Sequence, residues 1–512
     1  MTGNAFPVRG VGLYSFQNRS QEIVCARRQK NHRNLGGLVI CKSEILRITE
    51  PKMWGIVFIL CVGSRLLTTI YYIEDLDSLR FALSMVDYDV AKLQPHFPAY
   101  PVFCFVGKLI YAITGRYALA FSLIGGVSIF FIVFFLLKIA GIRNTSSVGL
   151  IAIFMLLANP LLWLMGNRYM PDAMGVGLVL ASLYFMTVQD EQPRKVGIGF
   201  FLAGVLGGVR LSYLPILIPA LLMRLHGRWQ TLKFIVAGAA GVTVWLAPLI
   251  ILTGWESFVD AAQTHSRGHF LEFGGTISSE PGLGLRFTKL FESVWADGFG
   301  LYWNGRHLIT ACTTVTLLGI LGTNWARIKN IKRSSFLNTS FIGCVIYFIW
   351  IFCFQNVVYK SRHVLPLVPF LALFIAFACA KIVAQSNRIL KVVLVVFFCC
   401  YGYVTLHLVV QHKKPTAIAQ IHQYLKAKES DKLHVVSVPL IKYYLAAQGL
   451  KAAYTPIKTA EDLAKLDKKL DDTSELVAIG SPLHDRAPKT QKTFFHNPYV
   501  NRMWPELSVF EY

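Results

Sequence analysis

Long apolar stretches, separated by short polar ones, run along most of this sequence. A stretch of roughly 18 or more apolar residues is long enough to cross a membrane as a helix, and by this criterion the pattern predicts about eleven spans. The two that flank Arg210 are short enough to be half-spans. We expect the spans at residues 54–73, 117–140, 147–164, 171–188, 195–209, 211–226, 232–252, 307–324, 336–354, 363–384 and 389–411. The sequence therefore predicts an all-α polytopic membrane protein.

The two ends of the chain differ from this pattern. Residues 1–52 are polar and basic, lack a signal-peptide core, and are expected to be a disordered cytoplasmic extension. Met53 directly precedes the first apolar stretch, so the sequence leaves open whether the extension belongs to the mature protein. Residues 412–512 are charged and predict a small soluble α/β domain beyond the membrane domain of residues 53–411. We expect its strands at 433–438, 452–455 and 475–479 and its helices at 440–448 and 459–470.

Composition and charge support a membrane protein and set its orientation. The 512 residues are 54% hydrophobic and only 15% charged, whereas soluble domains carry about 25% charged residues. The net charge of +23 would suggest nucleic acid in a soluble protein, but many basic residues lie in short loops between apolar stretches. Because basic loops stay cytoplasmic, the external segments are predicted at residues 74–116, 165–170, 253–306, 355–362 and 412–512. Interfacial helices are expected within the first of these segments.

Three acids follow the first apolar stretch directly: Glu74, Asp75 and Asp77. Charge at the edge of a membrane is costly, so it is usually paired or functional. A partly desolvated carboxylate at a helix end suits a general base. The alternative is a solvated loop that only marks the end of the helix.

Further candidates lie on the same predicted face. Asp172 follows Pro171 at the start of a helix, where it either faces a site or only favours the helix dipole. Arg210 ends a glycine-rich run and either binds phosphate or reaches the membrane interface. Basic residues on the external side oppose the usual charge bias, so they need a ligand such as a lipid phosphate or an anionic headgroup. They occur just before a late helix, as Lys360, Arg362 and His363.

The long external segment contains a cluster of His265, Arg267 and His269. Two histidines four residues apart on a helix could hold a metal, but Gly268 between them favours the end of a loop. Contact with a phosphate or an acceptor, and a plain polar loop, are the other interpretations. The ten cysteines show no spacing typical of a metal site or a disulfide framework.

Short motifs on this face resemble those of GT-C-type membrane glycosyltransferases. The run Asp77-Ser78-Leu79-Arg80-Phe81-Ala82 resembles the Asp-x-x-Arg-aromatic-Ala motif of the lipid A aminoarabinose transferases, and protein O-mannosyltransferases carry a related acidic pair. The segment 95–103, with His96 and Tyr100, resembles the proline-rich element that opens their second interfacial helix. Ser78 departs from the family, which has Glu there. The resemblance covers roughly residues 54–411 and is to a bacterial-type member.

The resemblance implies a function and a set of roles. The expected reaction transfers a hexosyl or pentosyl group from a polyprenyl-phosphate donor to a lipid, glycan or protein acceptor. It would take place at the extracytoplasmic face of a bacterial inner membrane. Asp77 would be the base. The residues predicted to act in catalysis are Asp77, Asp75 and Asp172, and those predicted to bind the donor phosphate are Arg210, Arg362, His363 and Lys360. The residues predicted to contact the acceptor are His265, Arg267, His269, Tyr100 and His96.

The resemblance names no certain cofactor, and a divalent metal, the sugar, the acceptor and the oligomeric state stay open. No nucleic-acid partner is expected. The alternative function is a transporter or flippase for lipid-linked glycans. Transporters place their charges near the middle of the bilayer on broken helices, whereas here the charges lie at one rim, which favours the enzyme.

Overall fold

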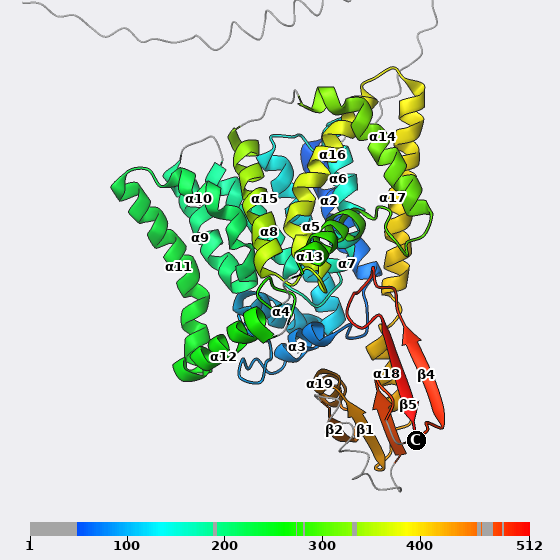
Figure 1. The fold of residues 1–512 in the computed structure, drawn as a ribbon. Helices are drawn as coiled ribbons and strands as arrows, with labels where there is room; N and C mark the ends of the chain where they lie inside the picture. The colour runs from blue at the N-terminus through cyan, green and yellow to red at the C-terminus, as the bar shows by residue number, and fades with distance from the viewer. Residues whose placement is uncertain are drawn as a thin grey trace, which may run out of the picture. The chain divides into compact units, whose positions relative to one another are not determined.

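The computed structural model describes residues 49–187, 192–272, 274–279, 282–329, 335–457, 462, 475–483 and 486–512. Most of the predicted extension 1–52 and most of the predicted helix 459–470 therefore lie outside the described residues. Helices make up the described chain as far as residue 426 (Figure 1). They are α2 (Glu50–Leu67), α3 (Leu76–Ser84), α4 (Pro101–Thr114), α5 (Tyr117–Ile139), α6 (Ser147–Leu157), α7 (Pro160–Met165), α8 (Asp172–Thr187), α9 (Pro193–Arg210), η1 (Leu211–Leu217), α10 (Ile218–Arg224), α11 (Arg228–Thr253), α12 (Trp255–Arg267), η2 (Gly268–Glu272), α13 (Leu283–Glu292), η3 (Ser293–Asp297), α14 (Ile309–Lys329), α15 (Ser335–Phe354), η4 (Ser361–Leu367), α16 (Val368–Val383), α17 (Arg388–His412) and α18 (Ala417–Lys426).

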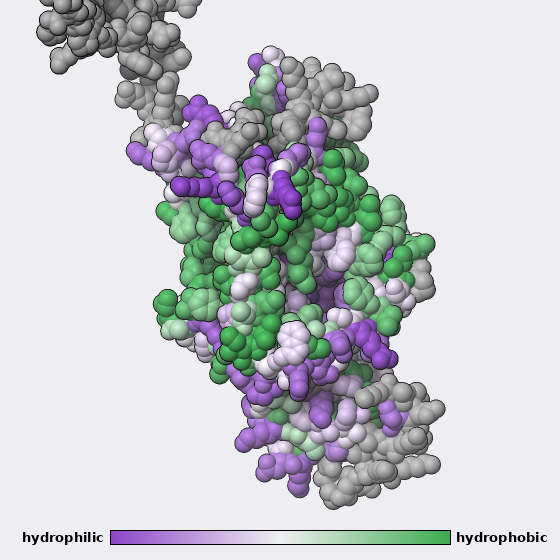
Figure 2. Space-filling model, turned by 90° about the vertical axis from the view of Figure 1, so that its left-hand side faces the viewer, coloured by the Kyte–Doolittle hydropathy of each residue, from purple (hydrophilic) through white to green (hydrophobic). Residues whose placement is uncertain are grey.

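The helical part is an integral membrane protein, as its apolar surface indicates. Figure 2 shows a hydrophobic belt between two hydrophilic ends. Within the described residues, five helical stretches are long and apolar enough to cross a membrane, and shorter apolar helices accompany them. The five are Tyr117–Ile139, Pro193–Arg224, Arg228–Thr253, Ser361–Val383 and Arg388–Lys426. The all-α membrane architecture is confirmed, but the count of eleven spans is not.

Interruptions of the helices explain part of that difference. The expected span 147–164 is divided into α6 and α7, because Pro160 cannot continue the hydrogen-bond ladder of α6. Asn159 instead caps α7 by accepting a hydrogen bond from the Leu162 amide at 2.9 Å. At Arg210 the backbone takes the extended values φ −155° and ψ 82°, which ends α9 before the short 3-10 helix η1.

The glycine-rich run before Arg210 lies inside α9 and not in a turn. A Cβ on Gly204 would come within 2.2 Å of the Gly238 carbonyl oxygen, and one on Gly241 within 2.1 Å of the Phe201 carbonyl oxygen. Small residues let helix backbones approach closely in membranes. The glycines therefore pack α9 against α11.

The residues from 433 onward form the expected small α/β domain, with more strands than the sequence predicted. Its elements are β1 (Leu433–Ser437), α19 (Pro439–Ala447), β2 (Ala453–Pro456), β3 (Glu475–Ile479), β4 (Thr490–Phe495) and β5 (Glu506–Glu511). The sheet order is β2-β1-β3-β5-β4; β1 pairs in parallel with β2 and β3, and β5 is antiparallel to β3 and β4. The register places Val435 opposite Val477.

Helix α3 joins the membrane part to the C-terminal domain. Leu76 and Leu79 belong to the same buried cluster as Ile421 of α18 and Tyr444 of the C-terminal domain. The opposite side of α3, with Phe81, packs in a separate cluster with residues of α4 and α5. Burying a leucine side chain contributes about 1.5–3 kcal/mol. Helix α3 is thus held from both sides, and this fixes the position of the acids at its start.

Candidate active site

Asp77 lies in the first turn of α3 and is 5% exposed. Its Oδ2 atom accepts hydrogen bonds from Lys360 Nζ and from Arg362 Nη2, each at 2.7 Å. Lys360 is the N-cap of η4, and Arg362 lies in its first turn. Burial alone would raise the pKa of Asp77, but the charges of Lys360 and Arg362 outweigh it and hold that pKa well below its usual range. Asp77 is therefore an ionised carboxylate between two cations.

A second ion pair connects the start of α8 with the end of α9. Arg210 Nη2 lies 3.1 Å from Asp172 Oδ1, and Tyr213 donates a hydrogen bond to the same oxygen at 3.0 Å. Arg210 Nη1 also donates to the Tyr100 hydroxyl at 3.1 Å, and that hydroxyl lies 3.3 Å from His96 Nε2. Four of the predicted residues thus form one buried chain: Asp172, Arg210, Tyr100 and His96.

The histidines beside Asp77 are neutral near pH 7. The rings of His96 and His265 are 5.4 Å apart. Burial lowers the pKa of His265 to about 4 and holds the pKa of His96 well below its usual range, although Asp77 opposes both shifts. Burial also lowers the pKa of His269, whose Nε2 lies 2.9 Å from the Phe354 carbonyl oxygen. Helix α12 continues as a π-helical turn through Gly268. The expectation that Gly268 marks the end of a loop between His265 and His269 is therefore wrong.

Glu74 belongs to a different cluster, three residues before Asp77. Its carboxylate accepts a hydrogen bond from Arg168 at 2.6 Å and one from the Asn501 amide at 3.1 Å. His412 Nε2 lies 3.3 Å from its other oxygen. Burial would raise the pKa of Glu74, but Arg168 and His412 lower it to about 2. Glu74 therefore fastens the end of α17 and the C-terminal domain to the membrane part.

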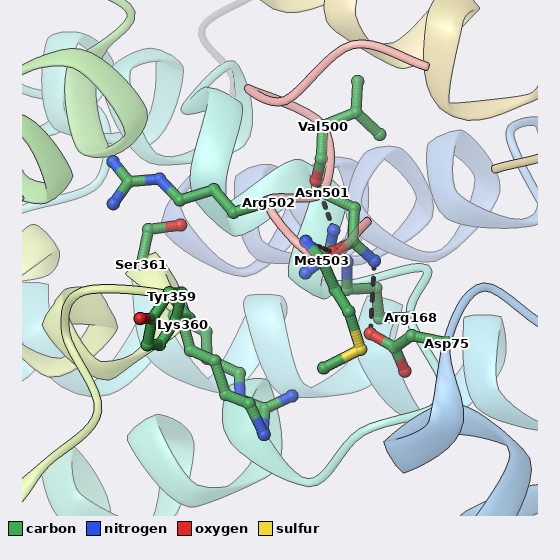
Figure 3. Close-up of a pocket in the computed structure, with 10 residues that line it drawn as sticks. Asp75, Arg168, Tyr359, Lys360, Ser361, Val500, Asn501, Arg502 and Met503 are labelled. Atoms are coloured by element: carbon green, nitrogen blue, oxygen red, sulfur yellow. Dashed lines mark hydrogen bonds between the residues drawn. The ribbon is translucent and has the colours of Figure 1, made fainter. Parts of the chain in front are cut away.

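A loop of the C-terminal domain, residues 497–503, closes the space above the acids. Asn501 donates to Asp75 Oδ2 at 3.1 Å, and Arg168 donates to the Val500 carbonyl (Figure 3). Asn501, Arg502 and Met503 line a cavity together with Asp75, Lys360 and Arg362. Its volume is only about 20 Å³, roughly the space of one water molecule. This cavity beside Asp75, Lys360 and Arg362 therefore has room for little more than one water.

A buried ion cluster holds the other side of the same loop. Arg502 donates a charge-assisted hydrogen bond to Asp297 and lies 3.3 Å from Glu292. Arg306 lies 3.6 Å from Asp297 on the opposite side. The loop 497–503 is thus anchored to the acids that follow α2 and to the π-helical turn η3.

The remaining predicted residues divide between the site and its surroundings. Asp75 is the N-cap of α3, where it accepts a hydrogen bond from the Ser78 amide at 2.8 Å. His363 is buried next to Arg362, and its Nδ1 has no hydrogen-bond partner among the described residues. Arg267 pairs with Glu272 at 3.0 Å, but its side chain is 75% exposed. Within the described part of the chain, no three potential ligands of the His, Cys, Asp or Glu type gather to hold a metal.

Sequence reasoning missed the residues that fasten the site. No role was expected for Arg168, Tyr213, Asn501 or Arg502. Arg168 carried a signal, since a basic residue in a short loop that is predicted to be external opposes the charge bias. The two C-terminal residues carried none, because only the packing of the C-terminal domain brings them to the acids.

Comparisons with known proteins agree with the fold. The sequence matches no family model and no curated protein. The chain shares its fold with solved structures of ArnT, which confirms the resemblance seen in the motifs at the level of the fold.

The solved structures it resembles include ArnT from Cupriavidus metallidurans bound to undecaprenyl phosphate, with a TM-score of 0.53 and 12% identity over 89% of this chain and 97% of that one. The apo state of the same ArnT gives 0.53 and 12% over 90% and 98%. An Archaeoglobus fulgidus oligosaccharyltransferase is more distant, with a TM-score of 0.45 and 12% identity over 83% of this chain and 67% of that one.

Proposed function

We propose that this protein transfers a sugar from a polyprenyl-phosphate-linked donor to an acceptor at the extracytoplasmic face of a bacterial inner membrane. The observation that carries the proposal is the cluster of Asp77, Lys360 and Arg362. One carboxylate oxygen takes a hydrogen bond from both cations at 2.7 Å. Glycosyl transfer from a phosphate donor needs the same two kinds of group: a carboxylate for the acceptor and cations for the leaving phosphate.

An exchange of ion partners links donor binding to the activation of Asp77. A donor phosphate that enters the site competes with Asp77 for Lys360 and Arg362, which bind phosphates with charge-assisted hydrogen bonds. Asp77 then loses the two cations that lower its pKa. Its affinity for a proton rises, and it becomes a better base for an acceptor hydroxyl or amine only once the donor is bound.

The chain of residues behind this cluster supports the same assignment. Asp172, which accepts a hydrogen bond from Tyr213, pairs with one terminal nitrogen of Arg210, and the Tyr100 hydroxyl accepts a hydrogen bond from the other. Arg210 therefore has a fixed direction, and together with His363 it would add a second cationic or donating wall for the phosphate. Negative charge that develops on the leaving phosphate is stabilised best by groups already held in place.

The surface of the helical part favours a donor that is a lipid. Figure 2 shows a hollow in the hydrophobic belt with hydrophilic surface at its depth. A polyprenyl chain suits the apolar belt and a sugar phosphate suits the polar interior. Undecaprenyl phosphate occupies the ArnT structure that shares this fold, which supports a donor of the same chemical class.

The closed cavity adds a requirement. A space of about 20 Å³ admits no sugar, since that is roughly one water. A sugar that enters this cavity therefore requires Lys360, whose side chain is 26% exposed, or the loop 497–503 to move. Asp77, Asp172 and Arg210 lie at the ends of helices, which supports transfer over transport through a broken helix.

The test is a transfer assay with purified protein, membrane extract and labelled polyprenyl-phosphate hexose or pentose. Asp77→Asn should lower transfer about 10²–10⁴-fold, the usual contribution of a positioned base. The matched control is Asp87→Asn, an exposed acid of the same loop, which should retain full activity. Equal activity of Asp77→Asn and wild type would overturn the assignment of Asp77. Movement of lipid-linked glycan across liposomes without any transfer would support the transporter instead.

A further inference from the structure

A second, larger cavity lies apart from Asp77, between the first turn of α14, the last turns of α17 and the loop 497–503. It encloses about 350 Å³, within the range of small-molecule sites, about 300–1,000 Å³. None of the residues assigned to sugar transfer lines it. The cavity lies beside the last turns of α17, the helix that leads through α18 into the C-terminal domain; Figure 1 shows this end of α17 next to that domain.

The polar end of this cavity is built around Arg306. The Arg306 side chain is 3% exposed. None of its three guanidinium nitrogens makes a hydrogen bond to a described residue. Its contacts are the ion pair with Asp297 at 3.6 Å and a stack over the Tyr499 ring at 3.9 Å. A buried guanidinium whose ion pair is as long as 3.6 Å is suited to a phosphate, which it binds through charge-assisted hydrogen bonds.

Further donors surround Arg306. His307 and His407 face one another across the cavity with ring centres 6.2 Å apart. The side-chain amide of Gln411 lies 2.7 Å from His407 Nε2. Imidazole and amide groups donate hydrogen bonds to phosphate oxygens or to the hydroxyls of a polar headgroup.

The other end of the cavity is apolar and continues onto the lipid-facing surface. Leu408 and Val404 form part of its wall. The neighbouring side chains of Leu308 and Leu406 are 78% and 56% exposed. Apolar side chains with such exposure on membrane helices face lipid chains. The cavity is therefore polar at one end and open to hydrocarbon at the other, which is the shape of an amphiphile.

We propose that this cavity binds the phosphate headgroup of an anionic membrane phospholipid, with Arg306, His307 and His407 around the headgroup and the acyl chains along α14 and α17. The lipid would also contact the loop that closes the candidate active site. Tyr499 lines this cavity, and Val500 to Met503 line the small one. Bound lipid would thus steady the loop 497–503. The proposal does not rest on sugar transfer.

The test uses full-length protein, purified and delipidated in detergent, and native mass spectrometry to count bound lipids. The probes are dioleoyl phosphatidylglycerol, dioleoyl phosphatidylcholine and inorganic phosphate. Wild type should retain one phosphatidylglycerol at least fivefold more tightly than phosphatidylcholine. Arg306→Gln should lose this one lipid or bind it at least fivefold more weakly. Because Arg306 is buried, the double variant His307→Ala/His407→Ala, which changes two exposed residues, is measured beside it.

The control is Lys413→Gln/Lys414→Gln, which removes two exposed charges next to α17 but outside the cavity. It should bind phosphatidylglycerol as wild type does. Three results would overturn the proposal: unchanged lipid binding in both cavity variants, equal binding of phosphatidylcholine, or displacement of the lipid by inorganic phosphate alone. The last would assign the cavity to a free anion.

Discussion

Two carboxylates three residues apart, Glu74 and Asp77, have different surroundings. Glu74 contacts groups from three distant segments: Arg168 after α7, His412 at the end of α17, and Asn501 in the C-terminal domain. Asp77 contacts the side chains of a single segment, Lys360 and Arg362. Both are buried, and both have a lowered pKa caused by neighbouring cations.

The difference teaches which acid is structural and which is available for chemistry. Every partner of Glu74 is itself buried, so its replacement leaves an uncompensated charge inside the protein. Asp77 is held by cations of the kind that bind phosphate, and Lys360 is partly open to solvent. An ion pair that a substrate can take apart is suited to catalysis, whereas one enclosed by the chain itself holds the fold together.

The largest effect on stability is expected from Glu74→Gln. The change leaves Arg168 buried without its carboxylate, and breaking a buried ion pair costs about 3–5 kcal/mol. Chemical denaturation of the purified protein in detergent measures the change in the free energy of unfolding. The control Asp87→Asn breaks an exposed ion pair, with side chains 60% and 55% exposed, and should cost about 0–1 kcal/mol. Equal losses in the two variants would show that Glu74 has no special structural role.

Arg362→Gln should lower the catalytic rate more than Glu74→Gln does when the two variants are compared at the same loss of stability. Loss of a hydrogen bond to a charged group costs about 1.5–3 kcal/mol. We therefore expect donor kcat/KM to fall about 10–100-fold. Lys360→Arg, which keeps the charge, should retain most of the activity. Full activity in Arg362→Gln would separate this residue from the donor phosphate and return it to a purely structural role.

Acid should weaken the fold through Glu74. Because the pKa of Glu74 is lowered to about 2 from 4.5, its ion pair contributes full stability above about pH 4.5. That contribution is lost as the pH falls toward 2. The decline of Tm between these limits should be shallower in Glu74→Gln than in wild type, while Asp87→Asn should follow wild type. Identical slopes in all three proteins would place the acid sensitivity elsewhere.

The smallest effect is expected from Arg267→Gln. The ion pair of Arg267 with Glu272 is exposed on both sides, at 75% and 54%, so its loss should change unfolding by less than about 1 kcal/mol. An acceptor role would show as a raised acceptor KM with unchanged stability. If the acceptor KM and the stability both stay at wild-type values, Arg267 is a surface residue without a role in acceptor binding.

Much of the architecture was predictable from local patterns. Apolar stretches without charges can only be buried in lipid or protein, and the alternation of strands and helices after residue 433 followed from their own periodicity. β3 was predicted with the bounds that the structure shows, Glu475–Ile479. Two strands escaped, β4 and β5, because their segments carry lysines and acids on exposed faces. Pro160 indicated a break in the helix, but the apolar residues on both sides of it favoured the prediction of one continuous span.

Part of the candidate site was also predictable. Asp77 matched a motif, and the basic residues near residue 360 were conspicuous because they lie in a predicted external segment, where basic residues are rare. What the sequence did not show was that they meet, since a separation of 283 residues between Lys360 and Asp77 leaves no local trace. The roles of Glu74 and Asp75 were equally hidden, because a capping acid and a catalytic acid look alike in a sequence.

The sequence by itself determined a membrane protein with acids and bases at one rim and a small domain after them. Hydrophobicity and charge act locally, so their pattern is enough for that. Only the tertiary structure decided which acid faces which base. It also decided that a loop of the C-terminal domain closes the site through Asn501 and Arg502. The physical reason is that ion pairs in a low-dielectric interior depend on distances of a few ångströms, and packing alone sets those distances.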